Sequence, residues 1–321
     1  MTQILHPQSE SEWLQLRVFD VTSTESPALF GLSPWMTAFE LWHQKKAAQV
    51  VQIDENERMS WGKALEQSIA KMVSKRYGVK IRRLSAYMRC ENVRMGASFD
   101  YEIVGAEAGE VDDTVLQNLY TEHGPGVLEI KNVDRSVFAA NWNTNGEPAA
   151  PDHIEIQVQH QLQVIERPWS CIAALVGGNR MHLIPRMRDR EVGTAIVAKV
   201  VKFWESIESN HAPDPTLPQD AEFIGKLCGY AETGKLLDKR GDYKLAQLAD
   251  LYKRAAAAAQ QAEDEKKSAK AELLLAIGDA EKVLLDGFKI SASMHAPAEV
   301  KAYTRPGYRD FRISEVKEKS K

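Results

Sequence analysis

The sequence predicts an α/β fold, with a central mixed sheet flanked by helices, followed by a C-terminal helical arm and a small β-element. Three observations favour this class. Apolar and polar residues alternate over 126–133, which is typical of a half-buried strand. Apolar residues at helical spacing indicate helices over 60–77 and 151–165. A Gly-Gly-Asn turn at 177–179 between two apolar runs predicts a β-hairpin.

The first long helix is expected over 60–77, with Ser60 as its N-cap and Gly78 as its C-cap. Its apolar stripe is expected to consist of Trp61, Leu65, Ile69, Met72 and Val73. Glu66 falls at the margin of that stripe, where a carboxylate can reach a cleft at the edge of the sheet.

Two strand-like segments carry charged side chains of catalytic type. The run 96–103 contains Asp100, and Glu129 and Lys131 point to one face of the next strand because side chains alternate. A carboxylate beside an ammonium suits metal-assisted hydrolysis of a phosphodiester. The carboxylate can hold a hard divalent cation, while the ammonium orients the attacking water and helps to deprotonate it. Taken alone, such a pair is more often a solvated ion pair that contributes little to stability.

The segments around these strands are less distinctive. The acidic, Gly-containing stretch 105–125 is expected to be an extended hairpin loop. In the helix over 151–165, the amide of Gln157 can hydrogen-bond a phosphate, whereas Gln161 is expected at a polar helix margin. A basic group follows the hairpin and is suited to contacting phosphates: Arg180, Arg186, Arg188 and Arg190.

The last third of the chain differs in composition. Prolines at 213, 215 and 218 mark a linker, so we expect one domain over 1–212 and a second part over 213–321 that packs on the first. This second part is expected to contain a helix over 243–285 and strands over 287–294, 299–304 and 309–314.

Bulk properties limit the setting of the protein. The 321 residues can bury a full core, and the net charge of −4 argues against a protein that coats nucleic acid over its whole surface. Three scattered cysteines indicate a reducing compartment. No apolar stretch approaches the ~18 residues of a membrane span, and no secretory signal is evident, so a cytoplasmic location is expected.

Over roughly 10–210 the chain resembles the lambda-type phage recombination exonucleases, also called alkaline exonucleases or viral recombinase nucleases, of the PD-(D/E)XK superfamily. The matching fragments follow the family order: 13–17, 21–25, 31–35, 61–66, Asp100, 128–131 and 156–159. Phe99 stands before Asp100 where the family has proline, and the long segment before Glu129 offers Asp112 and Asp113 as competitors for the same role.

The resemblance implies a restriction-endonuclease-like nuclease core over 1–212 and a Mg²⁺ site at which Mn²⁺ can substitute. Asp100, Glu129, the Ile130 carbonyl and Glu66 would hold the metal, with Lys131 and Gln157 as further catalytic residues. Arg17 and Thr24, with Ser23 as a neighbouring candidate, would bind a 5′-phosphate.

The implied activity is Mg²⁺-dependent 5′-to-3′ degradation of one strand of linear double-stranded DNA from a 5′-phosphorylated end. This leaves 3′ single-stranded overhangs for recombination. The resemblance also implies a homotrimer, a single-strand annealing protein as partner, and a phage or prophage origin in a bacterial host. Two alternatives stay open, an endonuclease of the same fold and a non-catalytic DNA-binding scaffold.

Overall fold

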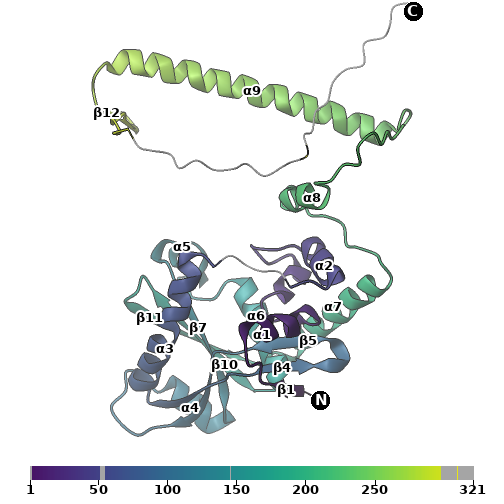
Figure 1. Ribbon diagram of the computed structural model, residues 1–321. Coiled ribbons are helices and arrows are strands. Elements are labelled where there is room, and N and C mark those ends of the chain that lie inside the picture. The colour runs from purple at the N-terminus through teal and green to yellow at the C-terminus, as the bar shows by residue number, and fades with distance from the viewer. Residues whose placement is uncertain (1, 51–54, 145, 298–308, 310–321) are drawn as a thin grey trace, which may run out of the picture. The chain divides into compact units, whose positions relative to one another are not determined.

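The computed structural model describes residues 2–50, 55–144, 146–297 and 309. The chain divides into the compact units Met1–Phe223 and Ile224–Lys321 (Figure 1). The strand expected over 299–304 lies outside the described residues, as does all of 309–314 except Arg309.

A mixed sheet forms the centre of the first unit. Among the described residues it has five strands in the order β11-β10-β7-β6-β3. These are β3 (Val79–Arg83), β6 (Tyr101–Ala106), β7 (Gly126–Val133), β10 (Trp169–Val176) and β11 (Arg180–Met187). β7 and β10 are parallel and the other neighbours are antiparallel, which confirms the predicted mixed sheet. The expected hairpin is confirmed by β10 and β11, in which Val176 pairs with Arg180.

Helices cover both faces of this sheet (Figure 1). Helices α3 (Glu57–Tyr77) and α4 (Val115–His123) pack on one face, and α6 (Asp152–Ile165) and α7 (Arg190–Glu208) contribute to the core on the other. The alternation along β7 explains the two cores. Leu128 and Ile130 join the α3 side, whereas Val127 and Val133 join the α6 side. The α/β class with flanking helices is therefore confirmed.

A second, smaller sheet has the order β1-β4-β5-β2. Its strands are β1 (Thr2–Leu5), β2 (Val21–Thr22), β4 (Tyr87–Cys90) and β5 (Met95–Ser98). Helices α1 (Glu10–Val18) and α2 (Ala38–Ala47) and the 3₁₀ turns η1 (Ser26–Phe30) and η2 (Glu91–Val93) belong to the same part of the chain. β5 leads through Phe99 and Asp100 directly into β6, so the two sheets meet at the predicted catalytic aspartate.

The connection from β7 to α6 is built from short elements. α5 (Arg135–Asn141) begins directly after β7, because the Asp134 side chain caps it by accepting a hydrogen bond from the Ser136 amide. The short strands β8 (Asn143–Thr144) and β9 (Glu147–Pro148) then pair with each other before α6 begins.

The first long helix differs from its prediction at one end. It begins at Glu57 with Asn56 as N-cap, not at Ser60, because the Asn56 side chain accepts a hydrogen bond from the Met59 amide at 3.0 Å. The C-cap at Gly78 is correct. The buried stripe consists of Ile69, Ala70, Val73 and Tyr77. Trp61 and Met72 are 56% and 48% exposed, so their assignment to the core was wrong.

Two further expectations need correction. The strand expected over 96–103 is interrupted at Phe99 and Asp100, which separates β5 from β6. The expected loop over 105–125 contains α4, a nine-residue helix. Its apolar residues follow helical spacing, and Leu116 is fully buried while Leu119 and Tyr120 pack against the same core.

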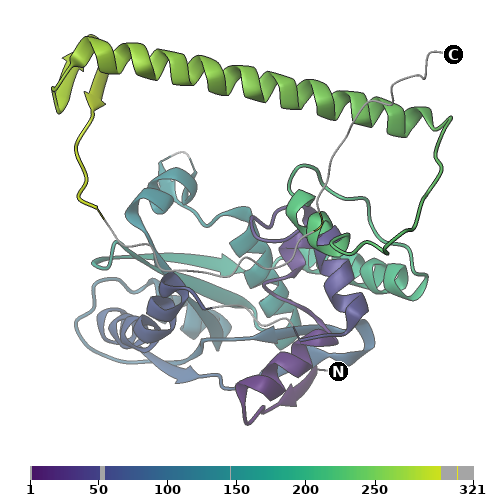
Figure 2. The same ribbon diagram turned by 45° about the horizontal axis from the view of Figure 1, so that its top comes forward.

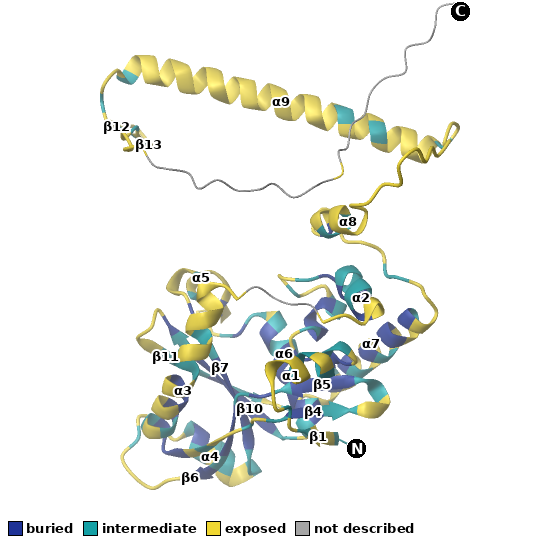
Figure 3. Ribbon diagram, in the orientation of Figure 1, coloured by how far each residue is buried: buried dark blue, intermediate teal, exposed yellow. Residues whose placement is uncertain are grey.

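The second unit is built from elements with little buried surface. α8 (Ala221–Leu227) spans the division between the units, and α9 (Tyr243–Ile277) is one unbroken helix (Figure 2). α9 was expected to reach residue 285, but it ends at Gly278, whose φ of +58° favours glycine. β12 (Lys282–Leu285) and β13 (Phe288–Ser291) then form a hairpin. Figure 3 shows that α9 is exposed over nearly its whole length, in contrast to the strands of the first unit.

None of the described helices is both long and apolar enough to cross a membrane.

Candidate active site

Glu129 and Lys131 lie side by side on β7, as the alternation predicts. Lys131 Nζ donates to Oε1 of Glu129 at 2.7 Å, and the Glu129 side chain is almost completely buried. A solvated surface pair would leave both groups in water. This carboxylate is instead enclosed, so its interactions are stronger than those of an exposed ion pair.

Two amides from α6 complete the surroundings of Glu129. Gln157 Nε2 donates to Oε1 of Glu129 at 2.6 Å, and Gln161 Nε2 donates to Oε2 at 2.8 Å. Lys131 Nζ also donates to Oε1 of the Gln157 side chain at 3.3 Å. The expectation that Gln161 lies at a polar helix margin was wrong, since this side chain is 1% exposed. The signal for it was present in the sequence, because Gln157 and Gln161 are one helical turn apart beside the buried stripe.

Asp100 approaches the same point from the junction between β5 and β6. Its Oδ2 accepts a hydrogen bond from the Ile130 amide at 2.8 Å. Burial, and next the negative charge of Glu129, raise the pKa of Asp100 to about 8, while Lys131 and the Ile130 hydrogen bond oppose the rise. The structure therefore brings Asp100, Glu129, Lys131 and Gln157 together in one centre.

The protonation of Lys131 limits what it can do. Burial lowers the pKa of Lys131, but the charges of Glu129 and Asp100 outweigh burial and raise the pKa above its ordinary value. The side chain is therefore an ammonium near neutral pH. As an ammonium it can orient the attacking water and stabilise developing negative charge, but it has no lone pair with which to accept a proton. The expected role in orienting the water therefore fits this geometry, whereas the expected help in deprotonating it does not.

Glu66 comes from α3 and stands somewhat apart from this centre. Its carboxylate lies 3.7 Å from the Arg83 guanidinium and is about one-quarter exposed. Its negative charge is the smallest contribution to the raised pKa of Asp100. Glu66 thus acts on the centre through its charge, and in the described part of the chain no hydrogen bond joins it to Asp100 or Glu129.

The donor set suits a hard cation that keeps much of its hydration. Within the described residues, no three carboxylate, histidine or cysteine side chains lie close enough to hold a metal ion by themselves. Asp100 and Glu129 nevertheless place two carboxylates together, with the Ile130 carbonyl on the residue that follows Glu129. Magnesium binds oxygen ligands and often takes few from the protein, so these residues fit it.

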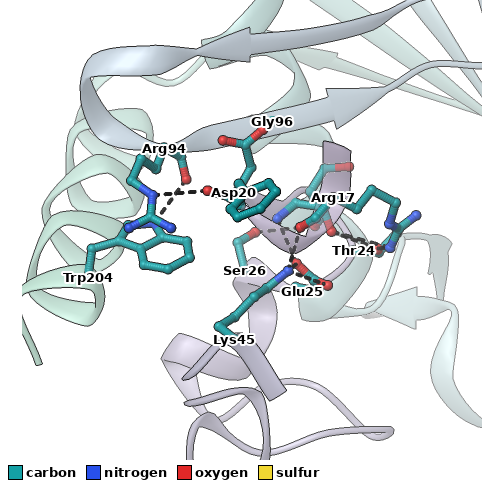
Figure 4. A network of polar contacts seen from close by, with 12 residues as sticks. Arg17, Asp20, Thr24, Glu25, Ser26, Lys45, Arg94, Gly96 and Trp204 are labelled. Atoms are coloured by element: carbon teal, nitrogen blue, oxygen red, sulfur yellow. Dashed lines mark hydrogen bonds and ion pairs between the residues drawn. The ribbon is translucent and has the colours of Figure 1, made fainter. Parts of the chain in front are cut away.

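A second cluster forms around Arg17 on α1 (Figure 4). The Arg17 guanidinium lies 4.5 Å from the centroid of the Trp13 ring and 3.3 Å from the Thr24 hydroxyl. Thr24 is exposed, whereas the neighbouring Ser23 is only 4% exposed. The structure thus brings Arg17 and Thr24 together at the surface and leaves Ser23 buried beside them.

Lys45 and Glu25 hold this cluster in place, although neither was predicted as a site residue. Lys45 Nζ donates to the Arg17 carbonyl at 2.8 Å and lies 2.8 Å from the Glu25 carboxylate (Figure 4). Glu25 in turn accepts from the Thr22 amide at 2.9 Å. Burial raises the pKa of Glu25, but the charges of Lys45 and Arg17 outweigh it and lower the pKa below its usual value, so the ion pair persists at neutral pH.

Ser98 connects the two clusters. Trp13 Nε1 donates to the Ser98 hydroxyl at 2.8 Å, and Gln161 Nε2 donates to the Ser98 carbonyl at 3.1 Å. Trp13 stacks on Arg17, and Gln161 binds Glu129. The Arg17 cluster and the Glu129 centre are therefore adjacent parts of one site.

The part of the chain that holds this site matches a known family. The sequence model of the family described as "YqaJ-like viral recombinase domain" matches residues 12–168, a range that contains every predicted site residue. A Bacillus subtilis (strain 168) protein described as "Uncharacterized protein YqaJ" is 28% identical over 235 residues, which cover 72% of this chain and 67% of that protein.

Solved exonuclease structures are also similar to this chain. An alkaline exonuclease, LHK-Exo, from Laribacter hongkongensis has 18% identity and a TM-score of 0.44, covering 68% of this chain and 100% of that one. A phage related exonuclease from Haemophilus somnus 129PT has 12% identity and a TM-score of 0.37, covering 62% of this chain and 99% of that one. The match over residues 12–168 confirms the resemblance seen in the sequence and identifies this part of the chain as a YqaJ-like viral recombinase domain.

Proposed function

We propose that this protein is a Mg²⁺-dependent 5′-to-3′ exonuclease. It degrades one strand of linear double-stranded DNA from a 5′-phosphorylated end and leaves 3′ overhangs for recombination. The match of residues 12–168 to a viral recombinase domain supports a nuclease role in recombination. The observation that carries the proposal is the enclosed centre in which Lys131 and two glutamines hold Glu129 beside Asp100.

In this proposal Asp100, Glu129 and the Ile130 carbonyl hold the magnesium ion, and Glu66 adds negative charge from the side. Mn²⁺ is expected to substitute, because it accepts the same oxygen ligands. When bound, the ion polarises the phosphodiester and lowers the pKa of the attacking water.

The chain's own groups then orient the reactants. Lys131, as an ammonium 2.7 Å from Glu129, donates a hydrogen bond to the attacking water and stabilises the negative charge that develops on the phosphate. Gln157 and Gln161 fix both oxygens of Glu129 without adding charge. This leaves the carboxylate in a single orientation before substrate arrives.

Arg17 and Thr24 supply the end recognition. A planar guanidinium can bind a terminal phosphate through two parallel hydrogen bonds, and the exposed Thr24 hydroxyl 3.3 Å away can donate another. Since this cluster adjoins the cleavage centre through Ser98, a phosphate held there would place a nearby phosphodiester at Lys131. Recognition of a terminal phosphate would explain both the 5′-to-3′ direction and mononucleotide products.

The assembly and setting are part of the same proposal. The protein acts as a homotrimer in the bacterial cytoplasm, as the product of a phage or prophage. A single-strand annealing protein receives the overhang that digestion leaves.

The proposal is tested with linear duplexes that carry either a 5′-phosphate or a 5′-hydroxyl, and with closed circular duplex DNA. Mg²⁺-dependent release of mononucleotides is expected from phosphorylated linear ends, more slowly from hydroxyl ends, and not from circles. Cleavage of the circle would instead establish an endonuclease. No metal-dependent release from any substrate would favour the non-catalytic scaffold.

A further inference from the structure

A cavity of about 520 Å³ lies outside the site described above, next to α5 and the turn between β10 and β11. The residues that line it and matter here are Arg135, Phe138, Asn143, Asn179, Arg180 and His182. This volume lies within the range of small-ligand sites, which is about 300–1,000 Å³.

The register of the sheet places this cavity on the face of the sheet that carries Glu129 and Lys131. Lys131 pairs with Ala174 across β7 and β10, and Ala174 pairs with His182 across β10 and β11. Residues directly opposite each other point to the same face, so His182 stands in the same row as Lys131. Two strand spacings separate them, which is roughly 10 Å. Arg180 follows in the next row on that face, paired with Val176.

The cavity and the Arg17 cluster lie in opposite directions from the cleavage centre. Trp13 of the Arg17 cluster bonds Ser98, which precedes Asp100 and β6, on one side of β7. The cavity lies beyond β10, on the other side of β7. A strand whose end is held at Arg17 and which passes Lys131 would continue toward the cavity.

The walls of the cavity suit the two parts of a nucleotide. The Phe138 and His182 rings are stacked with centroids 4.7 Å apart, and Phe138 also stacks on Trp142 at 6.0 Å. These rings offer an aromatic surface on which a base can stack whatever its identity. Burial, and next the charge of Arg180, lower the pKa of His182, so the ring is neutral at physiological pH.

The charges at the rim favour an anion. Arg135 and Arg180 are exposed, and within the described part of the chain neither guanidinium has an acidic partner. This distinguishes Arg180 from Arg186 of the same predicted basic group, which has an acidic partner, and from Arg188, which is held by a neutral amide. Arg186 is 2.7 Å from Glu155, and Arg188 donates to Gln163 at 2.7 Å.

We propose that this cavity binds a nucleotide of the DNA strand on the far side of the cleaved bond, with its base on the Phe138–His182 pair and its phosphate at Arg135 and Arg180. The inference rests on the proposed nuclease function for its place along the strand. The binding itself requires no metal and no cleavage.

The test uses the full-length chain in EDTA, so that binding is measured without hydrolysis. Fluorescence anisotropy would compare a short thymidylate oligonucleotide with a strand of equal length made of abasic residues. Wild type is expected to prefer thymidylate about fivefold or more, as a stacked base requires. Phe138→Leu keeps the apolar volume and should remove this preference. Arg180→Ala should weaken binding of both strands and lower the salt dependence by about one phosphate contact.

The control is Lys202→Ala, which removes an exposed cation of α7 that does not line the cavity. It should bind both strands like wild type. The inference is overturned if Phe138→Leu and Arg180→Ala also bind like wild type, or if wild type binds neither strand or binds both equally. Mg²⁺-dependent nucleotide release by wild type separates the two proposals. Cavity-dependent binding without release defeats the nuclease alone, and release with unaltered binding in the variants defeats the cavity alone.

Discussion

The side-chain amide nitrogen of Gln161 donates one hydrogen bond to Oε2 of Glu129, at 2.8 Å, and another to the backbone carbonyl of Ser98, at 3.1 Å. Its own carbonyl oxygen is buried and has no hydrogen-bond partner in the described part of the chain. An unpaired buried acceptor costs free energy. The two hydrogen bonds that the amide nitrogen donates are therefore made at the expense of a partner for the side-chain oxygen. This arrangement fixes the carboxylate of Glu129 relative to the junction that precedes Asp100.

Replacing Gln161 by leucine should therefore lower kcat rather than raise KM. Losing a hydrogen bond to a charged group costs about 1.5–3 kcal/mol, which corresponds to roughly 10- to 100-fold in rate if the whole effect falls on the transition state. Steady-state kinetics of nucleotide release would measure it. The matched control is Gln159→Leu, because Gln159 is also buried on α6 but bonds the Met187 carbonyl and the Asp189 amide instead of Glu129. A positioning role is contradicted if both variants lower kcat alike.

Arg17→Ala should abolish the preference for phosphorylated ends. The guanidinium is held by the Trp13 ring and donates to the Thr24 hydroxyl, whereas Lys45 bonds only the backbone carbonyl of Arg17. The substitution therefore removes the cation that would bind the phosphate. We expect the ratio of kcat/KM for 5′-phosphate over 5′-hydroxyl ends to fall about 10-fold or more. The hydroxyl substrate serves as an internal control. A variant that loses activity on both ends equally would show a structural role instead.

The sequence predicted the sheet better than the helices around it. Strand alternation fixed which side of β7 carries Glu129 and Lys131, because a half-buried strand with period two has one possible assignment of faces. Helix α3 was predicted, but two residues of its expected apolar stripe, Trp61 and Met72, are exposed. Trp61 has the spacing of the apolar stripe, but it lies in the N-terminal part of α3. The buried residues of this helix begin only at Ile69.

The candidate site shows what single-sequence reasoning misses. Asp100, Glu129 and Lys131 belong to short local patterns and could be identified. Lys45 could not, since a lysine on an amphipathic helix is ordinarily solvated. Gln161 was assigned to a polar helix margin, because its spacing from Gln157 shows the shared side of the helix but not the Glu129 carboxylate that it binds. Their partners come from segments far away in the chain, and only the tertiary fold brings them together.

The buried His160 should make stability depend on pH in the acid range. Burial lowers its pKa to about 4 from 6.5, and its Nε2 lies 3.0 Å from the Gly96 carbonyl. The unfolded chain therefore binds a proton at this residue before the folded chain does. The free energy of unfolding should fall by about 3 kcal/mol between pH 6.5 and 4, and this contribution should be constant above that range.

Urea denaturation at several pH values would measure this slope. In His160→Gln the free energy of unfolding should fall less between pH 6.5 and 4 than it does in wild type. Substitution of the exposed His6 should leave the wild-type pH dependence unchanged. Equal slopes in wild type and His160→Gln would contradict a neutral buried imidazole.

The cysteines should differ widely in reactivity. Cys171 is buried, and burial raises the pKa of its thiol to about 12, whereas Cys228 is exposed. With a thiol-specific chromogenic reagent at mildly alkaline pH, Cys228 should react at once and Cys171 only after unfolding. Cys228→Ser should remove the fast phase. A fast phase that persists in this variant would contradict the packing of β10 or point to Cys90, which is partly exposed.

If the centre on β7 cleaves DNA, cleavage must depend on Lys131. Nucleotide release from a 5′-phosphorylated linear duplex would be measured with Mg²⁺ and with EDTA for wild type, Lys131→Ala and the control Lys71→Ala, whose lysine is exposed on α3. We predict metal-dependent release that falls about 100-fold or more in Lys131→Ala and is unchanged in Lys71→Ala. Release that survives in Lys131→Ala at the wild-type rate, or that does not require a metal, would contradict this account.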